Sequence, residues 1–89
     1  MDLKGLRSEI DSIDSQIVKL FEQRMDAVSK VAEYKKQNNL PVQNNKREEE
    51  ILQRVSSMVC NRNSKHVKTL FQSIFSITRA YEEEIIDRG

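Results

Sequence analysis

A stripe of apolar residues with one cation inside it constrains how the first part of this chain can fold. Apolar side chains recur at alternating spacings of three and four residues, at Leu3, Leu6, Ile10, Ile13, Ile17 and Leu20. This period is typical of a helix that buries one face. The next position of the stripe is Arg24, after which the apolar pattern resumes.

Arg24 has three possible environments, because an unpaired guanidinium away from water is costly. It can extend to solvent, or pair with a buried carboxylate such as Glu48 or Glu82. It can also face a pocket that receives an anion. The period alone leaves these alternatives open.

The rest of the chain predicts an all-α fold with three helices and a long N-terminal helix. We expect the first helix over residues 3–37, and it ends before Pro41 because proline cannot continue a helix. The second is expected over residues 45–60, where Asn45 and Glu48 resemble a capping box. The third is expected over residues 65–87, with Ser64 as its N-cap. Residues 1–89 make one domain.

The first helix is too long for a compact domain of this size. Its expected length is about 50 Å, whereas the domain should have a radius of gyration of about 12 Å. Part of its apolar stripe must therefore be covered by something else, and a second copy of the chain is the simplest candidate.

Composition excludes several classes of function. The charges nearly cancel, at a net +1, which argues against a nucleic-acid partner. Cys60 and His66 are the only residues of their types, so neither an internal disulfide nor a zinc site of ordinary composition can form. No signal core or membrane span is present in the sequence, and we expect a cytoplasmic protein without a metal.

Arg24 and Lys35 are expected to share one helix face. They are eleven residues apart, so their directions differ by about 20°, and they lie roughly 16 Å apart along the axis. Both side chains can lean toward a common point. Arg7 points about 100° away, so it could serve only the pocket of a partner chain. Alternatively, these are ordinary surface charges.

Polar residues also interrupt the stripe of the third helix. Thr78 follows Ile74 by one turn, and Glu82 follows Thr78 by another. Thr78 could instead bond to its own helix backbone, and Glu82 could belong to a solvated acidic run. If these groups face inward, they form a pocket with cations, carboxylates and a hydroxyl but no nucleophile–base pair. Such a pocket suits a small polyanion whose reaction needs only positioning and charge stabilisation.

At these residues the chain resembles the all-helical class of chorismate mutase. The opening Leu6-Arg7-x-x-Ile10-x-x-Ile13-Asp14 is similar to that family's first motif. The resemblance continues through Arg24 and Lys35, the Lys46-Arg47-Glu48 segment, and Thr78-x-x-x-Glu82, and it covers residues 3–85.

The resemblance implies an intertwined homodimer that forms a helical bundle, with the first helix shared across the two-fold axis. It implies the rearrangement of chorismate to prephenate, in phenylalanine and tyrosine biosynthesis, without a cofactor. Carried over by position, Arg24 would bind one substrate carboxylate and Arg7 of the partner subunit the other. Lys35 would contact the breaking ether oxygen, and Glu82 would lie beside that oxygen.

The remaining positions would surround the substrate. Glu48, with the backbone near Asn44, would bind the ring hydroxyl, and Thr78 and Arg47 would support the substrate from the pocket wall. Asn44 and Glu82 differ from the common bacterial pattern and are similar to fungal members, as is Thr78. Two alternatives are an isochorismate-pyruvate lyase on the same scaffold and a non-enzymatic helical dimerisation or regulatory module.

Overall fold

The chain consists of three helices joined by two short connections. The computed structural model describes residues 2–88, and these contain α1 (Leu3–Gln37), α2 (Asn45–Ser57) and α3 (Asn61–Asp87) and no strand. The predicted all-α class, with three helices and a long first helix, is confirmed. The two end residues of the predicted 1–89 domain lie outside the described residues.

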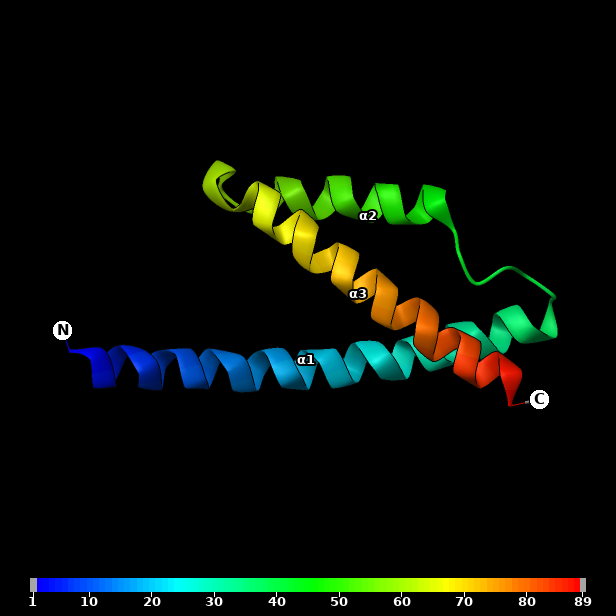
Figure 1. Cartoon of the computed structure of the whole chain (residues 1–89), viewed down its shortest axis with the longest axis horizontal. Coiled ribbons are helices and arrows are strands. Elements are labelled where there is room, and N and C mark those ends of the chain that lie inside the picture. Colours follow the sequence, from blue (N-terminus) through cyan, green and yellow to red (C-terminus); the bar gives the residue numbers. More distant parts are fainter. Residues whose placement is uncertain (1, 89) are drawn as a thin grey trace.

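The three helices form an elongated, open arrangement (Figure 1). α3 packs against both α1 and α2, whereas the backbones of α1 and α2 do not approach each other closely. The radius of gyration is 16.2 Å and the molecule measures 54 × 26 × 14 Å. The chain is therefore more extended than a compact domain of this length, because the N-terminal half of α1 has no buried residues and packs against neither of the other helices.

The bend after α1 follows from its local sequence. Asn39 adopts a left-handed backbone conformation, with φ 53°, which asparagine tolerates better than most residues. The Leu40 amide then donates to the Lys35 carbonyl at 2.9 Å, which closes the end of the helix. Pro41 follows and prevents any continuation. The resulting loop reverses the direction of the chain, so that α2 runs back in the opposite direction to α1 (Figure 1).

The predicted cap of α2, the predicted end of α2 and the predicted start of α3 were wrong. The capping residue of α2 is Asn44, not Asn45, and its side chain accepts a hydrogen bond from the Arg47 amide at 3.0 Å. α2 ends at Ser57 and α3 begins at Asn61, capped by Cys60 without a side-chain hydrogen bond. The residues predicted as a break, 61–64, form the first turn of α3, where polar residues are well tolerated because the amides lack partners within the helix.

The buried core is small and lies mainly between α2 and α3. Ile51 and Val55 of α2 pack against Phe75 of α3, and the Phe71 and Phe75 rings meet edge-on with centroids 6.2 Å apart. On α1 the only buried residues are Val28 and Ala32, both in its C-terminal half. The core therefore fixes α3 against the C-terminal half of α1 and leaves the N-terminal half without a partner.

The N-terminal half of α1 exposes its apolar stripe. Its exposed apolar side chains are Leu3, Leu6, Ile10, Ile13, Ile17, Val18, Leu20 and Phe21. A contiguous apolar stripe on a monomer surface is unusual and marks an interaction site. None of the described helices combines the length and apolar character needed to span a membrane.

Candidate active site

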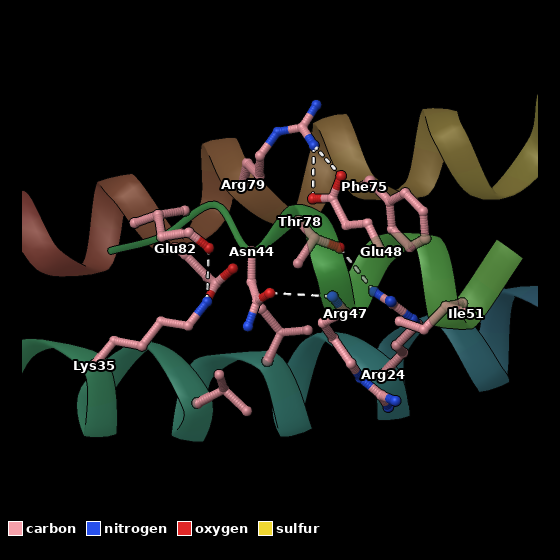
Figure 2. Close-up of a pocket in the computed structure, with 13 residues that line it drawn as sticks. Arg24, Lys35, Asn44, Arg47, Glu48, Ile51, Phe75, Thr78, Arg79 and Glu82 are labelled. Atoms are coloured by element: carbon pink, nitrogen blue, oxygen red, sulfur yellow. Dashed lines mark hydrogen bonds and ion pairs between the residues drawn. The ribbon is translucent and has the colours of Figure 1, made fainter. Parts of the chain in front are cut away.

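A cavity of about 200 Å³ lies where α1, the following loop, α2 and α3 surround a common space. Figure 2 shows the side chains that line it. Seven of the eight predicted site residues line this cavity: Arg24, Lys35, Asn44, Arg47, Glu48, Thr78 and Glu82. The eighth, Arg7, lies elsewhere. The separation of α1 from α2 leaves room for the cavity.

Arg24 reaches into the cavity and does not pair with a carboxylate of residues 2–88. Its Nη1 donates to Thr78 Oγ1 at 2.7 Å. Burial lowers the pKa of Arg24 from its usual value, and the Glu82 carboxylate partly opposes this shift. Of the environments predicted for Arg24, the structure favours the pocket, because four guanidinium N–H groups remain after the bond to Thr78.

Lys35 and Glu82 form the most buried charged contact of the site. Lys35 Nζ lies 2.9 Å from Glu82 Oε1, and the side chains are 16% and 4% exposed. This contact lacks hydrogen-bond alignment, and Glu82 Oε1 is buried without a hydrogen-bond partner in residues 2–88. The prediction that Glu82 could belong to a solvated acidic run was therefore wrong. Since Thr78 lies one turn before it, the apolar face of α3 carries both polar groups inward.

The loop after α1 orients the Lys35 amine. Lys35 Nζ donates to the Val42 carbonyl at 2.7 Å. An ammonium has three N–H donors. One is directed to Val42, and the contact with Glu82 is an ion pair without an aligned hydrogen bond, so a donor remains available to a bound molecule. The position of Pro41, which shapes this loop, thereby determines where the amine points.

Asn44 and Arg47 lie at the start of α2. The Asn44 side chain caps the helix, so its Oδ1 is already occupied by the Arg47 amide at 3.0 Å. The Arg47 side chain is 56% exposed and lies 3.8 Å from Glu50 in a loose ion pair. Arg47 therefore lines the cavity with a largely exposed side chain, which fits the alternative that it is a surface charge.

Glu48 has a charged partner that the sequence pattern did not reveal. Arg79 Nη1 donates to both carboxylate oxygens of Glu48, at 2.8 and 2.7 Å, and Arg79 also lines the cavity. The available signal was the position of Arg79 beside Thr78, one turn before Glu82. That signal is weak, because an arginine there could equally project into solvent.

Arg7 lies far from the cavity within this chain. It is exposed on the projecting half of α1, where it borders a shallow hollow with Leu3, Lys4, Ser8 and Asp11. The predicted difference in helical direction is consistent with this position. Nothing in the single chain brings Arg7 to the other site residues.

The geometry of the cavity matches the binding of a small anion. Arg24 and Lys35 enter from α1 with free donors, while Glu48 and Glu82 are each already matched to a cation. In residues 2–88 no group of three or more potential metal-ligating side chains comes together. The side chains present can bind, orient and stabilise charge.

Comparison with known proteins decides the family. Residues 6–83 match the family described as chorismate mutase type II. The chain belongs to this family. The match includes every predicted site residue, from Arg7 to Glu82.

Curated relatives are longer than this chain, and two of them are named as bifunctional chorismate mutase/prephenate dehydratases. The chain is 32% identical over 98% of its length to the bifunctional chorismate mutase/prephenate dehydratase of Buchnera aphidicola subsp. Schizaphis graminum, covering 23% of that protein. It is 47% identical over 57% of its length to the T-protein of Haemophilus influenzae, covering 14% of it. A bifunctional chorismate mutase/prephenate dehydratase of Aquifex aeolicus is 39% identical over 61% of the chain and 15% of that protein.

The chain thus spans less than a quarter of the length of these relatives. No solved structure matches the chain significantly. The assignment to the chorismate mutase type II family therefore rests on the sequence match.

The buried pair predicts a specific stability effect. Replacing Lys35 by Met leaves the Glu82 carboxylate buried without its cation, and we expect the free energy of unfolding to fall by about 3 kcal/mol at neutral pH. The same substitution in a Glu82→Gln background should cost clearly less, because no unpaired charge remains. Chemical denaturation of the four proteins measures this difference. Lys30→Met, at an exposed position of α1, is the matched control, and equal costs in both backgrounds would contradict the prediction.

Proposed function

We propose that this chain catalyses the rearrangement of chorismate to prephenate, a step in phenylalanine and tyrosine biosynthesis. The observation that carries the proposal is the convergence of Arg24, Lys35, Glu48, Thr78 and Glu82 on one cavity, in the order expected for the family. These residues come from all three helices. The named activity of the bifunctional relatives supports the same reaction.

The first task of the site is to select a folded conformer of the substrate. Chorismate carries two carboxylates and must bring the two ends of its rearranging system together. Arg24 binds one carboxylate through the guanidinium donors that Thr78 leaves free. The other carboxylate is held by Arg7 of the partner subunit. Fixing both ends in a reactive geometry removes much of the entropic barrier.

The second task is to stabilise charge in the transition state. Negative charge grows on the ether oxygen as its C–O bond breaks, and the remaining Lys35 donor is aimed at this atom. Because Val42 fixes the amine beforehand, little reorganisation is needed during the reaction. One such donor in a dry site contributes about 3 kcal/mol.

The site is completed by a second copy of the chain. The exposed apolar stripe of α1 and the exposed Leu70 and Ile77 of α3 are surfaces that an intertwined homodimer would bury. The projecting half of α1 would then deliver Arg7 to the partner's cavity. A dimer would thus account both for the burial of the apolar stripe of α1 and for the binding of the second substrate carboxylate.

Neither alternative function is favoured by a specific observation. A dimerisation module would not need the ion pairs that hold Glu48 and Glu82 inside a cavity. An isochorismate-pyruvate lyase would use a similar pocket, and product analysis distinguishes it. The cytoplasmic location and the lack of a nucleic-acid partner stay predictions from the sequence.

The primary test is turnover of chorismate by the 89-residue chain in the presence of a metal chelator. We expect loss of chorismate and formation of prephenate, without pyruvate release from isochorismate. Arg24→Met should reduce kcat/KM by about a hundredfold or more, because a carboxylate anchor is lost. Circular dichroism should show the variant folded. Arg54→Met, on the exposed surface of α2, is the control. A variant that only unfolds would assign Arg24 a structural role, and pyruvate as product would favour the lyase.

Glu82 pairs with Lys35 as a carboxylate in the free chain, and we propose that it donates a hydrogen bond as a carboxyl group once substrate is bound. An ionised carboxylate cannot donate a hydrogen bond to the ether oxygen, whereas a carboxyl group can. We therefore expect kcat/KM to decline as pH rises, and Glu82→Gln to remove this decline, because an amide donates at every pH. Steady-state kinetics from pH 5 to 9 measure both profiles, and parallel profiles would argue against the role.

The role of Arg7 predicts complementation between two inactive variants. Arg7→Ala and Lys35→Ala chains should each be inactive as homodimers. Mixing them after partial unfolding should restore about one intact site per mixed dimer, because one cavity then has both Lys35 and the partner's Arg7. Activity is measured after mass spectrometry establishes that heterodimers are present. Heterodimers without activity would eliminate the shared site.

A further inference from the structure

We infer that Arg79 is a positioning residue that holds Glu48 ready for the ring hydroxyl of the substrate. This inference rests on the proposed function. Arg79 Nη1 donates to both carboxylate oxygens of Glu48, at 2.8 and 2.7 Å. The two side chains are only 31% and 22% exposed, so solvent screens their attraction weakly. Within residues 2–88, Arg79 is the only cation that pairs with Glu48.

Glu48 requires such a partner because of what the cavity is proposed to bind. A carboxylate beside a doubly negative substrate repels it and is itself poorly solvated there. Arg79 offsets this charge without using Arg24 or Lys35. Figure 2 shows the Arg79 guanidinium over Glu48, on the α3 side of the cavity, while Arg24 and Lys35 enter from α1. The cations that meet the substrate therefore stay free.

The contact also leaves Glu48 able to accept the hydroxyl. A carboxylate offers about four lone-pair directions, and one Arg79 nitrogen shared between the two oxygens occupies only the side facing α3. Arg79 and Glu48 also border a second groove together with Leu52, Gln72 and Phe75. The two contacts from Arg79 fix the rotamer of Glu48, which also lines the cavity, and the carboxylate lone pairs that Arg79 does not use remain able to accept from the ring hydroxyl.

Neighbouring contacts hold Arg79 in place. Thr78, the preceding residue, accepts the hydrogen bond from Arg24, and Glu82, one turn later, contacts Lys35. Both contacts fix the rotation of α3 relative to α1. With that rotation fixed, Arg79 lies on the part of α3 that is near the start of α2, and its side chain reaches Glu48 there.

A double-mutant cycle tests whether Arg79 acts through Glu48. The four proteins are the unchanged chain, Arg79→Met, Glu48→Gln and the double variant, each assayed for kcat and KM with chorismate. We expect Arg79→Met to lower kcat/KM about tenfold in the unchanged background, mostly through KM. In the Glu48→Gln background it should change kcat/KM less than about twofold, because the charge that Arg79 holds is absent. Arg79→Lys should recover part of the loss, since an ammonium can also meet both oxygens.

Substrate specificity is a second measurement, and a purely structural role of Arg79 would leave it unchanged. Chorismate and an analogue without the ring hydroxyl are compared as substrates for the unchanged chain and for Arg79→Met. The preference for chorismate should shrink in the variant. Arg62→Met, at an exposed position of α3, is the matched control and should leave both measurements unchanged. If Arg79→Met fails to fold, Arg79→Gln, which keeps a polar side chain, replaces it in the cycle.

Two results would overturn the inference. Equal losses in the two backgrounds, or an unchanged preference for the hydroxyl, would show that Arg79 acts independently of Glu48. An unchanged chain that does not turn over chorismate would overturn the proposed function and this inference with it. If the unchanged chain is active but the double-mutant cycle shows no coupling between Arg79 and Glu48, only this inference is overturned.

Discussion

The contact between Lys35 and Glu82 is the constraint on which the rest of the site depends. Both side chains are largely buried, at 16% and 4% exposed, and each charge is compensated by the other. The pair joins α1 to α3 near the end of α1, directly before the chain turns back. The cavity therefore exists only in an arrangement in which α3 crosses α1 at this point.

α3 determines the site by presenting three polar residues within little more than one turn. Thr78 contacts Arg24, Arg79 contacts Glu48, and Glu82 contacts Lys35. Two of these contacts lead to α1 and one leads to α2. Because the backbones of α1 and α2 do not approach each other closely, their functional side chains are brought into register through α3. A small apolar core beside the cavity suffices, since the polar contacts themselves set the rotation of the helices.

Much of the fold could be predicted because apolar residues recur with a regular period along a long amphipathic helix. The extent of α1 follows from its stripe and from Pro41, and the inward direction of Arg24 follows from its place in that stripe. The beginning of α3 could not be found in this way, because residues that often interrupt helices are equally acceptable in a first turn. Arg79 was missed for a different reason: its partner lies on another helix, and no local spacing encodes a contact between α2 and α3.

The single chain leaves the N-terminal half of α1 without packing partners. In α1 one apolar period continues through both halves, yet only the C-terminal half is packed. A sequence selected only to fold as this monomer would gain nothing from apolar side chains at Leu6, Ile10 and Ile13, which increase the tendency to aggregate. Their presence, on the same segment as Arg7, is explained if one surface serves both assembly and substrate binding. On that account the length of α1 has a function. Its N-terminal half carries a cation from one chain to the cavity of another.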